Sequence, residues 1–211
     1  MSKPAGNEDA TAERETSKPQ SVRADARRNK DALLEAALAV FKSSGVDAPI
    51  REIAAEAGVG VGTVYRHFPE RADLIVAVFR REIDECADAA SILGAEHAPV
   101  EALALWMQRY ADFIATKRGL ASALHSGDPA YSSLPTYFDE RLRPALQTLL
   151  DSAAKAGEVR TDIEPNDLLR AVGNLCLSAQ DDQTNYVRRM VALLVDGLRY
   201  TVSPSLDTSN P

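Results

Sequence analysis

The sequence has few of the residues that build disulfide scaffolds, zinc sites or membrane spans. Its two cysteines, Cys86 and Cys176, lie far apart and form no CxxC or Cys/His cluster, which argues against a disulfide framework and a structural zinc site. No apolar run approaches the roughly 20 residues of a membrane-spanning helix, and the polar N-terminus lacks a signal-peptide core. These absences predict a cytoplasmic protein with no metal, no cofactor and no membrane partner.

Positive charge is also scarce. The chain has 24 basic and 31 acidic side chains, for a net charge of −7. This balance is unfavourable for nucleic-acid binding, which rests on neutralising phosphates. However, residues 22–68 carry one net positive charge, and four basic residues gather near the start of that segment: Arg23, Arg27, Arg28 and Lys30. A solvated helix face fits this pattern as well as a DNA-binding face does, so charge alone leaves the question open.

Alternating patterns typical of strands are absent, whereas apolar residues recur at i, i+3, i+4 spacing from about residue 30 to residue 200. The sequence therefore predicts an all-α fold. The expected organisation is a disordered tail at 1–21, a three-helix unit at 22–70, a longer helical domain at 71–202 and a tail at 203–211. The expected helices are 22–44, 49–57, 61–67, 71–91, 100–116, 118–125, 135–156, 165–179 and 184–202, with a break at Gly94.

Residues 49–67 have the pattern of a helix-turn-helix, in which the second helix enters the DNA major groove. Ile53 and Ala54 would pack inward, Gly58 would make the turn, and Val64 would lock the angle between the two helices. The residues left outside are Val61, Thr63, Tyr65, Arg66, His67 and Arg71. Among them, Thr63 suits a thymine methyl group, and Tyr65, His67 and Arg71 suit phosphates. An ordinary helical hairpin whose exposed residues have no role also fits, because bare helix-turn-helix spacing is common.

The stretch IREIAAEAGVGVGTVYRHFPERADLI, preceded by ALLEAALAVFKSSG, resembles the DNA-binding domain of TetR-family transcriptional regulators over about residues 26–80. The most specific part is the GxxxGTxYxHF arrangement. The resemblance implies a helical homodimer with N-terminal helix-turn-helix domains and a C-terminal domain that binds a small-molecule effector. It also implies that Thr63, Tyr65 and His67 occupy the usual DNA-contact positions, and that Arg71 stands where a lysine commonly begins the fourth helix.

Several positions depart from the family pattern. Gly60 replaces the usual Ser or Thr cap, Val61 replaces a long polar residue, and Ala48 and Pro49 replace the usual threonines before the second helix. We therefore expect specificity to depend on Thr63, on apolar contacts to thymine methyl groups, and on Arg51 or Arg66. The C-terminal half is similar to SbtR-like regulators in the segments RYADFIATKRGLASALHSG and LRPALQTLLDSAAKAGEVRTDIEPNDLLRAVGNLCLS.

The family's effector pocket lies among the middle helices, about residues 71–156 here. The candidate pocket walls are Trp106, Tyr110, Phe113, His125, Tyr137 and Phe138. The first three share one helix face, and an aromatic stripe at that spacing is also typical of plain core packing. His125 is close in sequence to Ser126 and Asp128, but such neighbours form no catalytic relay, and GxSxG and HExxH motifs are absent. The sequence therefore predicts no enzyme and no catalytic residues.

The last two helices carry wide apolar stripes. The candidate dimer-interface residues are Leu168, Val172, Leu175, Val187, Val191, Leu194 and Leu198. In a two-fold dimer these helices would form a four-helix bundle with their copies; alternatively, both stripes pack within the chain.

The combined prediction is a ligand-responsive transcriptional regulator, a repressor by analogy with most of the family. It would bind a palindromic double-stranded DNA operator as a homodimer through the major groove, and would associate with the nucleoid when bound. Arginine outnumbers lysine 18 to 6, which fits a GC-rich bacterial genome. The alternative is a helical ligand- or partner-binding protein whose DNA binding is weak or lost.

Overall fold

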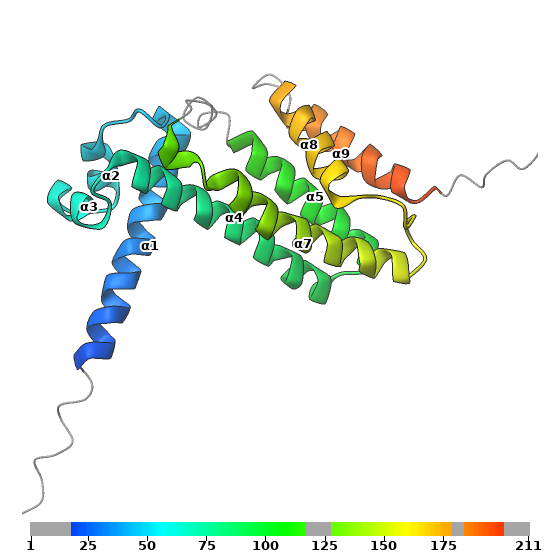
Figure 1. The fold of residues 1–211 in the computed structure, drawn as a ribbon, viewed down its shortest axis with the longest axis horizontal. Helices are drawn as coiled ribbons and strands as arrows, with labels where there is room; N and C mark the ends of the chain where they lie inside the picture. The colour runs from blue at the N-terminus through cyan, green and yellow to red at the C-terminus, as the bar shows by residue number, and fades with distance from the viewer. Residues whose placement is uncertain (1–17, 117–127, 179–183, 201–211) are drawn as a thin grey trace, which may run out of the picture.

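The computed structural model describes residues 18–116, 128–178 and 184–200, and every regular element in these ranges is a helix (Figure 1). The predicted all-α fold is therefore confirmed. The elements are α1 (Lys18–Ser44), α2 (Ile50–Glu56), α3 (Val61–His67), α4 (Arg71–Glu96), α5 (Pro99–Thr116), the 3₁₀ turn η2 (Pro129–Tyr131), α7 (Leu134–Lys155), α8 (Pro165–Ser178) and α9 (Thr184–Leu198). The expected helix at 118–125, the tail at 203–211 and most of the tail at 1–21 lie outside the described residues.

The first four helices enclose a core that we call the N-terminal core. Leu33 on α1, Ile53 on α2 and Val64 on α3 are all buried there. Phe68, which directly follows α3, and Phe79 on α4 complete it. Because α2 and α3 are only seven residues long, their stability depends on this packing more than on helix propensity.

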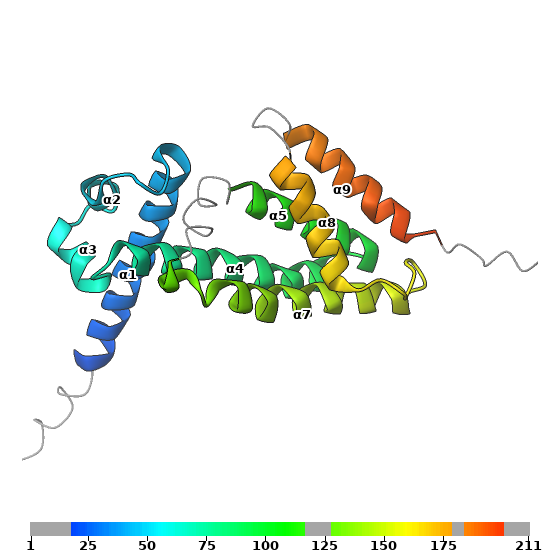
Figure 2. The same ribbon diagram turned by 45° about the horizontal axis from the view of Figure 1, so that its top comes forward.

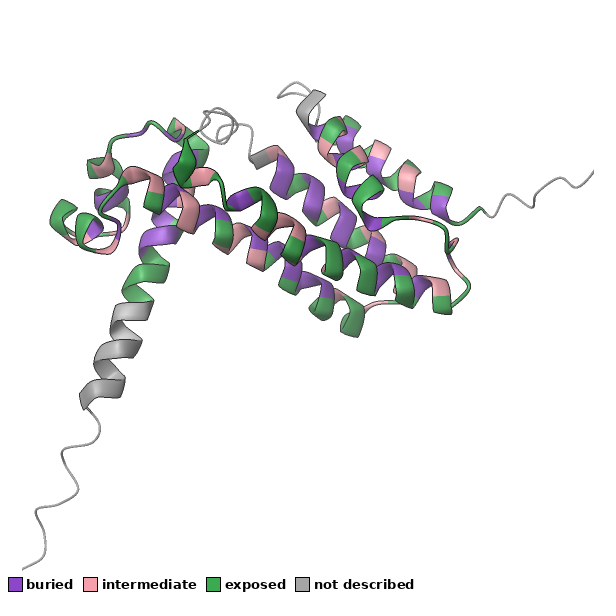
Figure 3. Cartoon of the chain, viewed as in Figure 1, coloured by how far each residue is buried: buried purple, intermediate pink, exposed green. Residues whose placement is uncertain are grey.

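A second core, the C-terminal core, surrounds α5. In Figures 1 and 2, α4 and α7 run side by side along one side of α5, while α8 and α9 cover another. Trp106 and Tyr110 of α5 are buried in it, and their rings stack with centroids 5.7 Å apart. Figure 3 shows the buried residues concentrated between these helices, with exposed residues on their outer faces.

Two segments connect the cores. One is α4, which contributes Leu74 and Val78 to the N-terminal core and Ile83 and Cys86 to the C-terminal core. The other is the start of α7, because Leu134 is buried in the N-terminal core while Leu142, about two turns later, is buried in the C-terminal core. The domain boundary predicted after residue 70 thus falls just before a helix that both cores share.

Some helix ends differ from the sequence-based expectation. Helix α1 begins at Lys18, four residues earlier than predicted. The break expected at Gly94 was wrong, because α4 continues to Glu96 and a Cβ at Gly94 would make only an ordinary contact with Leu149. Helix α7 runs through Pro144, as the expected helix at 135–156 does. Among the described helices, none combines the length and the apolar character needed to span a membrane.

Candidate functional site

The turn between α2 and α3 follows the geometry that the sequence predicts. Gly58 adopts φ +66°, a left-handed conformation that favours glycine. The amide of Gly58 donates to the Ala55 carbonyl (3.1 Å) and that of Val59 to the Ala54 carbonyl (2.9 Å), so the end of α2 is capped by its own backbone. Gly60 precedes α3 and provides no side-chain cap, as expected. The turn itself is therefore closed by backbone hydrogen bonds, while Val64 in the N-terminal core packs α3 against α2.

Helix α3 presents a mixed apolar and polar face to solvent. Val61 and Tyr65 are large hydrophobic residues with 40% and 49% of their surface exposed, and Arg66 is exposed as well. Thr63 and His67 are half-buried on the same helix, and Arg51 is exposed on α2. Six of the seven candidate DNA-contact residues thus lie on the two helices of one compact unit, none of them buried.

Arg71, the seventh candidate, has a different environment from the one expected. It begins α4, and its guanidinium donates hydrogen bonds to the Val46 carbonyl (2.9 Å from Nε) and the Ala48 carbonyl (2.5 Å from Nη2). These carbonyls belong to the loop between α1 and α2. A loop has few backbone partners of its own, so an arginine from another helix satisfies its acceptors. In this structure Arg71 clamps the loop to α4, and its expected contact with a phosphate stays a prediction.

The Arg71 clamp gives a first testable prediction. We expect Arg71→Met to lower the free energy of unfolding by about 1–2 kcal/mol, since the hydrogen bonds from a charged donor disappear and two carbonyls are left without that partner. Arg66→Met is the matched control, because Arg66 is an exposed arginine on α3, and we expect it to change stability by less than about 0.5 kcal/mol. Urea denaturation measures both; equal stability of the two variants would contradict the clamp.

Trp106 and Tyr110, the first two candidate pocket walls, are structural residues of the C-terminal core. Both side chains are almost fully buried, and each uses its polar group internally. The Trp106 indole N–H donates to the Cys86 carbonyl (2.8 Å), and the Tyr110 hydroxyl donates to the Leu169 carbonyl (3.1 Å). Burial raises the pKa of Tyr110 well above its ordinary value. Trp106 and Tyr110 are therefore core residues, as the alternative interpretation of the aromatic stripe held.

The remaining described candidates lie where α5 faces α7. Phe113 is buried and stacks with Phe138 at a centroid distance of 6.3 Å, and Phe138 also contacts the Tyr110 ring. Phe138 and Tyr137 are only half-buried, so this end of the aromatic cluster reaches the surface. His125 lies outside the described residues.

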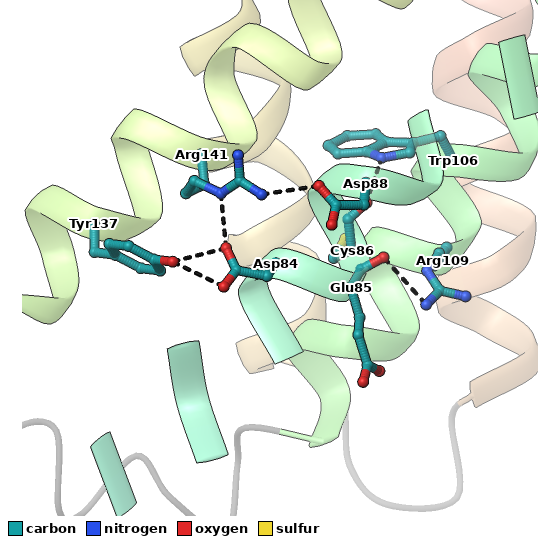
Figure 4. A network of polar contacts seen from close by, with 8 residues as sticks. All are labelled: Asp84, Glu85, Cys86, Asp88, Trp106, Arg109, Tyr137 and Arg141. Atoms are coloured by element: carbon teal, nitrogen blue, oxygen red, sulfur yellow. Dashed lines mark hydrogen bonds and ion pairs between the residues drawn. The ribbon is translucent and has the colours of Figure 1, made fainter. Parts of the chain in front are cut away.

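Tyr137 belongs to a polar network that the sequence-based reasoning missed (Figure 4). Its hydroxyl donates to Asp84 (2.7 Å), and Arg141 donates to Asp84 (2.7 Å) and to Asp88 (2.8 Å). Burial and the hydrogen bond to Asp84 raise the pKa of Tyr137. The signal was present as two i, i+4 pairs on two helices, one acidic and one Tyr/Arg. The network holds α4 against α7 beside the C-terminal core, against which Tyr137 packs.

Two open grooves lie beside α4. One, of about 920 Å³, runs between α1 and α4 and includes Lys30, Phe68 and Arg80 in its walls. The other, of about 530 Å³, lies between α4 and α5 and is lined in part by the exposed side chains of Ile92 and Leu105. Over residues 18–116, 128–178 and 184–200, no group of three His, Cys, Asp or Glu side chains is placed to hold a metal ion.

The predicted dimer residues are largely occupied within the chain. Five of the seven are buried in the C-terminal core: Leu168, Val172, Val187, Val191 and Leu198. Their stripes pack on α5, as the within-chain alternative proposed, so the assignment of these five to a partner surface is corrected. Leu175 and Leu194 are half-buried. The large apolar residues that α9 leaves exposed are Tyr186 and Leu193, the latter with 62% of its surface accessible.

Comparisons with known proteins place both halves of the chain in one family. Residues 33–78 match the model described as bacterial regulatory proteins of the tetR family, and residues 98–200 match the SbtR-like transcriptional regulator C-terminal domain. A TetR transcriptional regulator from Streptomyces coelicolor is 41% identical, covering 82% of this chain and 99% of its own, with a TM-score of 0.72. A TetR transcription regulatory protein from Mycobacterium vanbaalenii is 36% identical, covering 85% and 99%, with a TM-score of 0.66.

Curated relatives match over a shorter segment. An HTH-type transcriptional regulator of Staphylococcus aureus strain USA300 is 39% identical over 64 residues, which is 30% of this chain and 35% of that protein. The match thus spans about a third of the length of these curated relatives. The family consists of DNA-binding regulators and not of enzymes. The chain belongs to the TetR family of transcriptional regulators, with a helix-turn-helix DNA-binding domain at its N-terminus.

Proposed function

We propose that the protein is a ligand-responsive repressor that binds a palindromic operator as a homodimer. The observation that carries this proposal is the α2–α3 unit, which buries Val64 in the N-terminal core while Val61, Tyr65 and Arg66 stay exposed on the short second helix. An apolar and hydrogen-bonding face of this kind suits the base edges of a major groove. The repressor role rests on the family, and the protein acts in the cytoplasm, on nucleoid DNA.

The exposed residues divide into two kinds of contact. Val61 and the Thr63 methyl group suit the methyl groups of thymine, and the Thr63 hydroxyl adds a hydrogen bond to a base edge. The Tyr65 hydroxyl, His67 and one of the exposed arginines, Arg51 or Arg66, suit phosphates, which fix the register of the helix on the duplex. Arg71 supports this face by holding the loop before α2. The site therefore favours operators with thymine at the contacted positions.

Tyr65→Ala tests the interface directly. We expect it to weaken binding to a genomic fragment selected by the wild-type protein by roughly tenfold or more, because it removes a hydrogen bond to phosphate and an exposed apolar ring. Tyr200→Ala is the matched control, since Tyr200 is also exposed but follows α9, far along the chain from α3. Anisotropy titrations at two salt concentrations measure both variants. A folded wild-type protein that selects no fragment would instead support the helical ligand- or partner-binding alternative.

The dimer surface that we propose is the outer face of α9. Tyr186, Met190 and Leu193 recur at helical spacing on this face, and none of the three is buried within the chain. Pairing through a two-fold axis would cover these residues with their own copies. Such a dimer holds two recognition helices for two half-sites, which lie about 34–36 Å apart on DNA.

The effector site that we propose lies at the α5–α7 aromatic cluster, next to Phe113 and Phe138. Support comes from Phe138, which contacts both Tyr110 and Phe113 and still reaches the surface. The effector would change DNA affinity by favouring one relative position of the two recognition helices. A differential affinity of about 1–3 kcal/mol between the two states corresponds to a roughly 5- to 150-fold change in binding.

A further inference from the structure

Helices α4 and α5 leave two large apolar side chains exposed on their outer side. Ile92 on α4 and Leu105 on α5 have 57% and 38% of their surface accessible. Both line the groove of about 530 Å³ between the two helices, together with Ala89 and Leu93. A single exposed apolar residue is ordinary, but neighbours that share a groove are typical of a surface that binds a partner. The charges around the groove indicate which partner fits.

Two residues of opposite charge flank Leu105 on α5. Glu101 lies one turn before it and Arg109 one turn after it, so the i, i+4 spacing places all three along one exposed face. Figure 4 shows Arg109 donating to the Glu85 carbonyl (3.3 Å), and no carboxylate of a described residue lies within ion-pair distance of its guanidinium. We call Glu101, Leu105 and Arg109, with the neighbouring Ile92, the α5 strip.

The other charged residues near the α5 strip leave its polarity unchanged. Three acidic residues are each paired with an arginine of the same chain: Glu85 with Arg81 (2.8 Å), Asp88 with Arg141 (2.8 Å) and Asp112 with Arg188 (3.2 Å). Glu96, exposed at the end of α4, adds to the acidic end, where His97 lies 3.4 Å from the Glu101 carboxylate. The strip is therefore acidic near the α4–α5 turn, apolar in the middle and basic at Arg109.

The α5 strip and the proposed α9 dimer surface face different directions. Arg188 on α9 faces α5, because its guanidinium donates to Asp112 and its carbonyl accepts from Gln108 (2.9 Å). With roughly 3.6 residues per turn, Tyr186, Met190 and Leu193 lie on the side of α9 opposite to Arg188. A dimer formed through α9 therefore leaves the α5 strip of each chain uncovered.

We propose that the α5 strip is a second self-association surface, through which two dimers form a tetramer. The argument for a second copy as the partner is that the strip is complementary to itself. Under a two-fold axis at Leu105, α5 lies antiparallel to its copy, so Leu105 meets Leu105 and each Glu101 meets an Arg109. Ile92 and the groove then surround the apolar centre of the contact. The inference rests on the α9 dimer proposed above and adds a second contact to it.

The contact is expected to be weak, since its ion pairs are exposed and its apolar centre is small. A weak contact still acts on DNA, because dimers bound at neighbouring operators have a high effective concentration relative to each other. The tetramer would therefore connect two operator-bound dimers, while a dilute dimer would bind a single operator with unchanged affinity.

A charge swap tests the antiparallel pairing. Glu101→Arg and Arg109→Glu each place like charges opposite one another, whereas the double variant Glu101→Arg/Arg109→Glu restores both pairs with their signs exchanged. Glu140→Arg is the matched control, since Glu140 is an exposed glutamate within α7. Sedimentation velocity follows each protein from about 1 to 500 µM, at about 50 mM salt to limit screening. Circular dichroism checks that every variant is folded.

We expect the wild-type dimer to form tetramers at the upper concentrations, and each single variant to do so roughly tenfold more weakly. The double variant should recover to within about threefold of the wild-type protein, and Glu140→Arg should match it. Leu105→Glu should remain dimeric and lose the tetramer. A double variant that associates no better than the single variants would overturn the inference, and so would a wild-type dimer that forms no tetramer.

The same measurements separate this inference from the proposals on which it rests. If the charge swap acted on the step from monomer to dimer, the α5 strip would be the dimer surface and the α9 assignment would fail. If the tetramer formed as expected but the wild-type protein selected no DNA fragment, the proposed operator binding would fail while the self-association surface would stand.

Discussion

A Leu193→Glu chain is expected to sediment as a monomer and to bind its operator at least about a hundredfold more weakly. Leu193 has 62% of its surface exposed in the isolated chain, so the substitution leaves the C-terminal core intact. In a two-fold dimer the same residue would be buried against its copy, and two glutamates facing each other would repel and lose solvation. Separating the chains would also abolish the linkage of two recognition helices, which contributes roughly 10²–10⁴ in avidity.

The choice of position matters in this experiment. Leu194 is half-buried and packs against the C-terminal core, so a glutamate there would perturb the fold as well as the dimer. Leu105→Glu on α5 is the matched control, since Leu105 is also an exposed leucine in the middle of a helix. Sedimentation velocity and DNA titration should distinguish the two variants. A Leu193→Glu protein that stays dimeric would refute the proposed α9 surface.

Trp106→Ala is expected to cost about 3–5 kcal/mol of unfolding free energy, the usual range for removing a large buried aromatic side chain. The indole has no exposed surface, stacks on Tyr110 and donates to the Cys86 carbonyl. The substitution would leave a cavity in the C-terminal core and remove the hydrogen bond that the indole adds to the Cys86 carbonyl. Urea denaturation measures this change when it is followed by far-ultraviolet circular dichroism, which reports secondary structure.

Phe138→Ala is the comparison variant, because Phe138 lies at the proposed effector site whereas Trp106 lies inside the C-terminal core. Phe138 is half-buried at the open end of the same aromatic cluster, so its removal should cost less stability than that of Trp106. If Trp106→Ala kept wild-type stability while altering effector response, Trp106 would be a pocket wall after all. Because Trp106 is fully buried and Phe138 is half-buried, we expect Trp106→Ala to lower the free energy of unfolding more than Phe138→Ala does.

The helix-turn-helix was predictable because its determinants are local. Gly58 alone specifies a left-handed turn, and the spacing of Ile53, Ala54 and Val64 places the apolar sides of two short helices against each other. These relationships all fall within residues 49–67. Periodicity and turn chemistry were therefore enough to predict the unit and to separate its buried residues from its exposed ones.

Contacts between segments that are distant in the sequence could not be predicted from local patterns. An apolar stripe on α8 or α9 shows that something covers it, but the stripe does not specify whether α5 or a second chain does so. Arg71 was likewise assigned from its position at the start of α4, whereas its partners, the carbonyls of Val46 and Ala48, become neighbours only when the loop folds back. In both cases the deciding contact joins segments that are distant in the sequence.

The burial of Leu134 in the N-terminal core has a mechanical consequence. A rigid unit attached through a single helix is free to rotate about the axis of that helix. Here the DNA-binding unit is attached at two points, through α4 and through the first residue of α7, and Tyr137 and Arg141 bind α7 to α4 just beyond. Two attachment points remove that rotational degree of freedom. In the dimer that we propose, a signal from the C-terminal domain would therefore move α4 and α7 together to change the distance between the two recognition helices.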